Sequence, residues 1–115
     1  MPKHNRSRLV DRELSQFASA RYEGDVAGAW RALERAHILG QTVILLHFVV
    51  HMRMLSFALQ TRDFRETGGQ LFRLALIPIG HALRRLPSGN TGRSDVSAFA
   101  IMPVPKDVAV ELAQD

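Results

Sequence analysis

Apolar side chains recur every three or four residues along most of this chain, the spacing that predicts amphipathic helices. A first helix is expected over residues 10–23 and a second over 26–39, with Gly24 ending the first and Asp25 capping the second. Gly40 ends the second helix. The pattern therefore favours an all-α fold.

The same spacing predicts a third helix over residues 41–61 and a fourth that Asp63 caps. Pro78 disturbs the fourth helix, so residues 79–86 are either a kinked continuation or a short separate helix. The apolar stripe expected to be buried on the fourth helix consists of Phe64, Leu71, Phe72 and Ala75.

The remainder of the chain differs in composition. Residues 87–92 are rich in turn formers, and Pro103 and Pro105 preclude a regular helix through Met102. Residues 108–113 are compatible with one or two last helical turns. The segment is nevertheless too apolar to be disordered, so we expect an extended C-terminal strap over residues 87–115. The predicted architecture is one domain spanning residues 1–115: a flexible basic N-terminus over 1–8, a body of four helices in two hairpins over 10–86, and the strap.

A weak internal repeat relates the segment from Asp25 to Gly40 to the segment from Asp63 to Pro78. Each copy has a capping aspartate at its start and a helix-breaking residue at its end. This organisation is similar to tetratricopeptide-like helical pairs, whose repeat is about 34 residues long. A protein-interaction module is therefore one functional hypothesis.

Composition limits the chemistry. The 115 residues are 46% hydrophobic and 23% charged, carry a net charge of +4, and include no cysteine. These values are typical of one globular domain, and they exclude disulfide scaffolds, thiolate metal sites and cysteine nucleophiles. The N-terminal segment is too polar for a signal peptide, and the apolar run over residues 42–59 contains two histidines and an arginine. We therefore expect a cytoplasmic protein without a membrane span.

Other functional classes find little support. The basic excess is nearly all arginine and is spread along the outward faces of the predicted helices, which disfavours nucleic-acid binding. The chain has no GxSxG, P-loop, GxGxxG or HExxH motif, so we expect a protein that is not an enzyme. Residues 88–92 could present backbone amides to an anion, although a plain turn is the favoured interpretation.

Three histidines carry the most specific signal. At about 100° per residue, His47 and His51 point away from the polar side of the third helix, and His37 lies on the apolar stripe of the second. Folding the two helices back on each other at Gly40 brings His37 towards His47. His47 and His51 have the i, i+4 spacing that lets two imidazoles share one ion. Glu34, one turn before His37, is the nearest carboxylate that could join or orient them.

Two interpretations of this cluster remain open. A metal site formed by His37, His47, His51 and Glu34 would suit zinc, copper or nickel, because imidazole nitrogen binds all three ions. A purely structural cluster would instead satisfy each buried imidazole with hydrogen bonds. His4 and His81 are not expected to take part, since His4 lies near the terminus and His81 follows Pro78.

Several strings of this sequence together resemble a small bacterial family known as domain of unknown function 3703. They run from Glu34 to Gln41, continue through His47 and His51 with Met54-Leu55, and include residues 89–92, 96–99 and 102–105. The resemblance spans nearly the whole chain. The family has no established activity, so the resemblance assigns no catalytic residue.

The sequence thus predicts a small, non-enzymatic binding protein whose inward histidines hold a transition metal or a similar ligand. The alternative is a tetratricopeptide-like interaction module with structural histidines. A protein partner or a homo-oligomer is compatible with either hypothesis.

Overall fold

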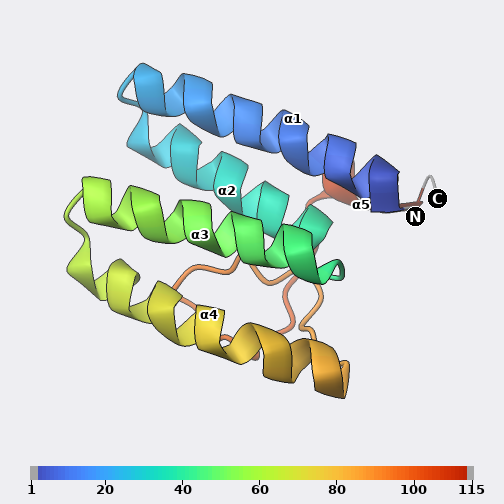
Figure 1. Cartoon of the computed structure of the whole chain (residues 1–115). Helices are drawn as coiled ribbons and strands as arrows, with labels where there is room; N and C mark the ends of the chain where they lie inside the picture. The colour runs from blue at the N-terminus through green and yellow to red at the C-terminus, as the bar shows by residue number, and fades with distance from the viewer. Residues whose placement is uncertain (1–2, 114–115) are drawn as a thin grey trace.

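The computed structural model describes residues 3–113. They form five helices: α1 (Lys3–Tyr22), α2 (Val26–Gly40), α3 (Ile44–Gln60), α4 (Phe64–Leu83) and α5 (Lys106–Ala113). None of these residues lies in a strand, so the predicted all-α class is confirmed for the described range. Figure 1 shows α1 to α4 side by side in chain order, each antiparallel to the one before it, with α5 behind α1 and α2.

Short capped turns produce this antiparallel order. The Asp25 side chain accepts a hydrogen bond from Gly28 N at 2.9 Å, and the Asp63 side chain accepts one from Glu66 N at 3.1 Å. Both aspartates are therefore the helix caps that the sequence predicted. Arg62, between α3 and α4, has a left-handed backbone with φ 57°, which lets the chain reverse there.

The apolar core lies among α1, α2, α3 and α5. Phe17 of α1 and Trp30 of α2 both pack edge-on against Phe57 of α3, with ring centroids 5.3 Å and 5.2 Å apart. Val108 of α5 closes this core and is fully buried. Among the described residues, no member of this core cluster belongs to α4. Contacts outside the cluster must therefore hold α4 against the other helices.

The inward side of α4 is largely polar, and the predicted stripe on this helix was wrong. Each member of that stripe is exposed, with Leu71 at 56% and Phe72 at 54%: Phe64, Leu71, Phe72 and Ala75. The buried residues of α4 are instead Glu66, Gln70, Arg73 and Ile77. Burial of these polar groups requires hydrogen-bond partners, which the following segment supplies.

Two further boundaries differ from the prediction, and an alternative left open at Pro78 is decided. Helix α1 begins at Lys3 rather than at Val10, and Arg6 on its first turns donates to the carbonyl oxygen of Leu39 at 2.8 Å. Helix α4 continues through Pro78, so the kinked-continuation alternative was closer than the separate helix. Helix α5 extends the one or two helical turns allowed over residues 108–113 back to Lys106, which makes five helices instead of four main ones. Residues 84–105 contain no helix or strand and cross the α3–α4 side of the row (Figure 1).

The apolar run on α3 is not a membrane span. Within residues 3–113, no helix is both long enough and apolar enough to cross a bilayer.

Candidate metal centre

His37, His47 and His51 converge in the interior between α2 and α3. All three are buried, and their ring centroids lie 4.7–4.9 Å apart. One ring nitrogen from each can be chosen so that all three atoms lie within 4.8 Å of one another. The structure therefore brings these imidazoles together, as their positions on a tight helical hairpin predicted.

Two of the three nitrogens already have the spacing of ligands on one ion. The Nε2 atoms of His37 and His47 are 3.1 Å apart. Two imidazoles bound to one zinc ion at ~2.1 Å hold their nitrogens ~3.0–3.4 Å apart, for angles of about 90–110° at the ion. The nitrogen that His51 offers lies within 4.8 Å of those that His37 and His47 offer, a wider limit than this spacing.

In two of the three imidazoles, a fixed hydrogen-bond acceptor holds the outer ring nitrogen. His37 Nδ1 lies 2.7 Å from the carbonyl oxygen of Asn90, and His51 Nδ1 lies 2.7 Å from Oε1 of Gln70. An oxygen that can only accept requires a proton on Nδ1, so the neutral ring keeps its lone pair on Nε2. Both Nε2 lone pairs are thereby available to a ligand, and this is how metal-binding histidines are usually oriented.

The orientation of Gln70 is itself determined by its neighbours. Its Nε2 donates to Glu66 Oε2 at 2.7 Å and to the carbonyl oxygen of Gly92 at 2.9 Å. Both amide hydrogens are therefore used, and Oε1 is the atom that remains to face His51. The amide cannot flip without breaking two hydrogen bonds.

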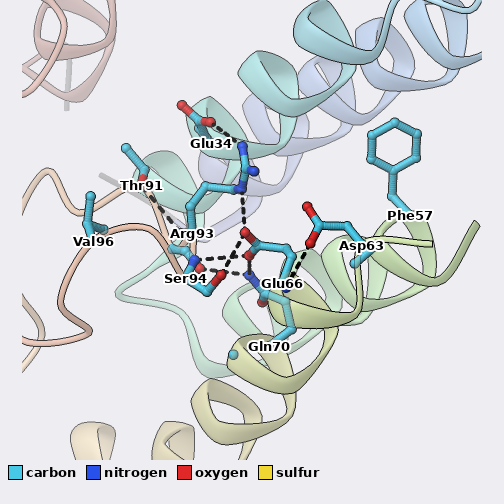
Figure 2. A network of polar contacts seen from close by, with 12 residues as sticks. Glu34, Phe57, Asp63, Glu66, Gln70, Thr91, Arg93, Ser94 and Val96 are labelled. Carbon is cyan, nitrogen blue, oxygen red and sulfur yellow. Dashed lines mark hydrogen bonds and ion pairs between the residues drawn. The ribbon is translucent and has the colours of Figure 1, made fainter. Parts of the chain in front are cut away.

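Glu66 is the centre of a polar network behind the histidines, shown in Figure 2. Besides Gln70, its carboxylate accepts from Arg93 Nε at 3.0 Å, from Ser94 N at 3.0 Å and from Ser94 Oγ at 2.8 Å. Burial alone would raise the pKa of Glu66, but the hydrogen bonds from Gln70, Ser94 and Arg93 outweigh burial and lower it. This buried carboxylate stays ionised and fixes the segment after α4 to the helix.

Glu34 does not join the three histidines. Its Oε2 accepts from Arg93 Nη1 at 3.2 Å, at the edge of the network in Figure 2. The group of nitrogens that can share an ion contains no oxygen of Glu34. Burial raises the pKa of Glu34, against the opposing effect of Arg93. The structure thus places this predicted ligand in an ion pair instead.

His81 extends the cluster, although the sequence analysis set it aside. Its Nε2 lies 2.9 Å from His47 Nδ1. Because His37 offers a lone pair on Nε2, neutral His47 must donate from its own Nε2 and accept at Nδ1 from His81. A metal ion on His47 Nε2 would require the opposite tautomer, with Nδ1 donating to His81.

All four imidazoles resist protonation. Burial is the largest cause in each case: it lowers the pKa of His47 to about 3, lowers that of His37 well below its usual value, and also lowers those of His51 and His81. The neighbouring imidazoles lower the pKa values of His37 and His47 further. The histidines are therefore neutral near pH 7, so metal binding would not have to compete with a second proton on any ring. In His47 the one ring proton would have to move from Nε2 to Nδ1.

Gly92 allows the loop to approach the cluster. Its φ is +82°, and a Cβ there would lie 2.7 Å from Cδ2 of His37. We expect Gly92→Ala to lower the free energy of unfolding by about 2–3 kcal/mol, because it adds left-handed strain and a clash with a buried ring. Gly68→Ala is the matched control, since its Cβ would meet nothing within 4 Å in mid-helix; it should raise stability by about 0.5–1 kcal/mol. Urea denaturation of both variants measures the difference, and equal effects would contradict the assigned role.

The family model described as "Protein of unknown function (DUF3703)" matches residues 4–112. The chain belongs to this family. The resemblance found in the sequence is thereby confirmed for nearly the full length of the chain. Comparison of this DUF3703 chain with curated proteins and with solved structures finds no match.

Sequence reasoning missed the groups of the DUF3703 chain that orient the imidazoles. Gln70, Asn90 and Glu66 are each buried and polar, and each is fully hydrogen-bonded. Two signals were present in the sequence. The residues at 66, 70 and 73 form a polar stripe at i, i+4 and i+7, and Asn90 lies between two glycines at 89 and 92, both of which adopt positive φ in the structure.

Proposed function

We propose that this protein binds one divalent transition-metal ion through His37, His47 and His51, and that it is a binding protein rather than an enzyme. The observation that carries the proposal is the 3.1 Å separation of the Nε2 atoms of His37 and His47, the spacing of two ligands on one ion. Asn90 and Gln70 orient the Nε2 lone pairs of His37 and His51 inward, and His47 offers its own once its proton moves from Nε2 to Nδ1. A buried cluster of neutral imidazoles with oriented lone pairs has the donor set of a three-histidine site.

The donor set favours borderline ions. The chain has no cysteine, and no carboxylate among the described residues joins the histidine group, so imidazole nitrogen supplies all three protein ligands. Such a set suits copper, zinc and nickel, with the intrinsic affinity highest for copper. It does not suit magnesium or calcium, which prefer oxygen ligands.

Metal analysis of the protein purified without a histidine tag tests the proposal. The wild type should take up one equivalent of Zn²⁺, and a His47→Ala, His51→Ala variant should take up none at the same concentration. His4→Ala is the matched control, because His4 belongs to α1, which is separated from α3 by α2. A wild type that binds no Zn²⁺, Cu²⁺ or Ni²⁺ contradicts the proposal.

His81 provides a finer test of the same site. In the metal-bound state His47 Nδ1 should donate to His81 Nε2, so His81→Phe removes an outer hydrogen bond to a ligand without removing a ligand. We expect the affinity for Zn²⁺ to fall about tenfold or more, since loss of such partners typically costs 10–100-fold. A competition titration with a chromophoric chelator measures the change, and an unaltered affinity would show that His81 does not orient His47.

A tetratricopeptide-like interaction module with structural histidines is the second candidate. Supporting it is a broad apolar surface on the outer faces of α3 and α4, where Leu45 is 75% exposed and Phe72 54%. The hydrogen-bonded chain from Asn90 through His37 and His47 to His81 also satisfies three imidazoles without an ion. Under this hypothesis the wild type takes up no metal, and Leu45→Ser with Phe72→Ser abolishes self-association or partner binding while leaving the fold intact.

A further inference from the structure

A cavity of about 240 Å³ lies beside the three histidines. The imidazoles of His37, His47 and His51 contribute to one side of it, and α4, the segment after α4 and Gln41 form the rest. Apolar side chains dominate those walls, among them Leu76, Ile77, Leu83, Leu86 and Phe99. An ion held by the three histidines would therefore border this space.

The cavity has positive groups and no negative ones. No aspartate or glutamate is among its lining residues within the described chain, whereas Arg73 and Arg85 are. Arg73 is only 8% exposed, and within residues 3–113 no carboxylate lies within ion-pair distance of it. Its guanidinium donates to the carbonyl oxygens of Gly69 and Val96, and its buried Nε has no partner there.

This charge arrangement favours the entry of an anion. Glu66 and Asp95 act on Arg73 only from beyond ion-pair distance, and burial still lowers the pKa of Arg73. A buried cation without a counter-ion is costly, and a bound divalent ion would add two more positive charges next to it. Three neutral imidazoles compensate none of that charge. A three-ligand site also leaves the ion one coordination position, which exogenous water or another ligand fills.

We propose that the metal-loaded protein binds a small organic carboxylate in this cavity, with its head on the open coordination position, balanced in charge by Arg73, and its apolar chain against the α4 wall. This inference rests on the proposed metal site. The volume equals that of roughly eight waters at ~30 Å³ each, so a carboxylate with about eight non-hydrogen atoms fills the space.

The test uses the full-length protein loaded with Co²⁺, whose visible spectrum reports a change of coordination. Acetate, butyrate and hexanoate are titrated separately, and each should alter the spectrum saturably. Affinity should rise by up to about fourfold for each methylene that enters the cavity. Equal affinities for acetate and hexanoate would overturn the assignment of the apolar walls.

Arg73 is tested with a matched pair of arginines on the same helix. Arg73→Met should weaken hexanoate binding about tenfold or more, while Arg73→Lys, which keeps the charge, should retain most of it. Arg65→Met is the control, because Arg65 is exposed on α4 and does not line the cavity. Co²⁺ uptake and circular dichroism show whether each variant is folded, and the wild-type chain-length series decides the proposal if Arg73→Met does not fold.

The outcomes separate this inference from the proposed function. A wild type that takes up no Co²⁺ or Zn²⁺ overturns the metal site itself. A loaded protein whose spectrum is unchanged at millimolar hexanoate overturns the carboxylate site and leaves the metal site standing. Equal hexanoate affinity of metal-free and loaded protein overturns the direct bond between carboxylate and ion.

Discussion

Replacing Glu66 with leucine is expected to lower the free energy of unfolding by about 3–5 kcal/mol, because it leaves buried donors and a half-buried guanidinium without their acceptor. The carboxylate is 3% exposed and accepts from Gln70, Arg93 and Ser94. It is also the main link between α4, which contributes nothing to the apolar core cluster, and the segment that follows it. Loss of this link should release the segment that carries Asn90.

The single tryptophan offers a local readout of this change. The guanidinium of Arg93 lies 3.8 Å from the ring centroid of Trp30, so displacement of Arg93 should alter Trp30 fluorescence before global unfolding. Urea denaturation followed by circular dichroism gives the stability. Glu66→Gln keeps one acceptor oxygen and should cost less than Glu66→Leu.

Glu23→Leu is the control for Glu66→Leu, because Glu23 is exposed in the turn directly after α1. It should change stability by no more than about 0.5 kcal/mol. A Glu66→Leu variant that loses less than about 1 kcal/mol would show that α4 is held mainly by Ile77 and its other apolar contacts.

The histidine cluster could be predicted because it depends on two local properties. Helical periodicity fixes the faces of His37, His47 and His51, and the short connection after Gly40 forces α2 and α3 into a hairpin. Neither property requires knowledge of distant parts of the chain. The convergence of these three imidazoles follows from them directly.

The orientation of α4 could not be predicted by the same reasoning. Periodicity identifies two stripes on this helix, and the usual preference for burying apolar groups selects the one with Leu71 and Phe72. The structure buries the other stripe, because Ser94 and the carbonyl oxygens of Gly92 and Val96 satisfy its polar groups. These partners lie more than twenty residues away, in a segment without regular periodicity.

His81 was missed for a related reason. Pro78 indicates a helix break, which leaves the direction of His81 undetermined. Helix α4 instead continues through Pro78, so His81 lies one turn after the buried Ile77 and faces His47. Only the path of the whole helix shows that a fourth imidazole contacts the cluster.

Acidification of the metal-free protein is expected to cause a large loss of stability between about pH 6.5 and pH 5. The pKa of His47 is lowered to about 3, and those of His37 and His51 are also lowered, chiefly by burial, whereas in the unfolded chain they are near 6.5. Below pH 6.5 the unfolded state therefore binds more protons than the folded state, so stability rises with pH in this range. The stability that depends on neutral imidazoles is fully present above pH 6.5 and is lost as the pH falls.

The expected magnitude is about 2 kcal/mol at pH 5 for each imidazole that stays neutral in the folded state. His37 and His47 together should account for about 4 kcal/mol, which is a large share of the 5–15 kcal/mol typical of a domain. The stability that ionised Glu66 contributes is lost only below pH 4.5, because its pKa is lowered in the folded state. Glu34, whose pKa is raised, weakly increases the stability as the pH falls. The window from pH 6.5 to 5 therefore reports mainly on the buried histidines.

Urea denaturation at about pH 7.5 and pH 5, in the presence of a chelator, measures this effect. A His47→Leu variant should show a pH-dependent loss smaller by about 2 kcal/mol, because one buried imidazole no longer titrates on unfolding. The His4→Ala variant should keep the wild-type dependence. Equal stability of the wild type at the two pH values would mean that the histidine cluster accepts protons while folded. Protons would then compete directly with the metal ion at pH 5, and the site would lose metal without unfolding.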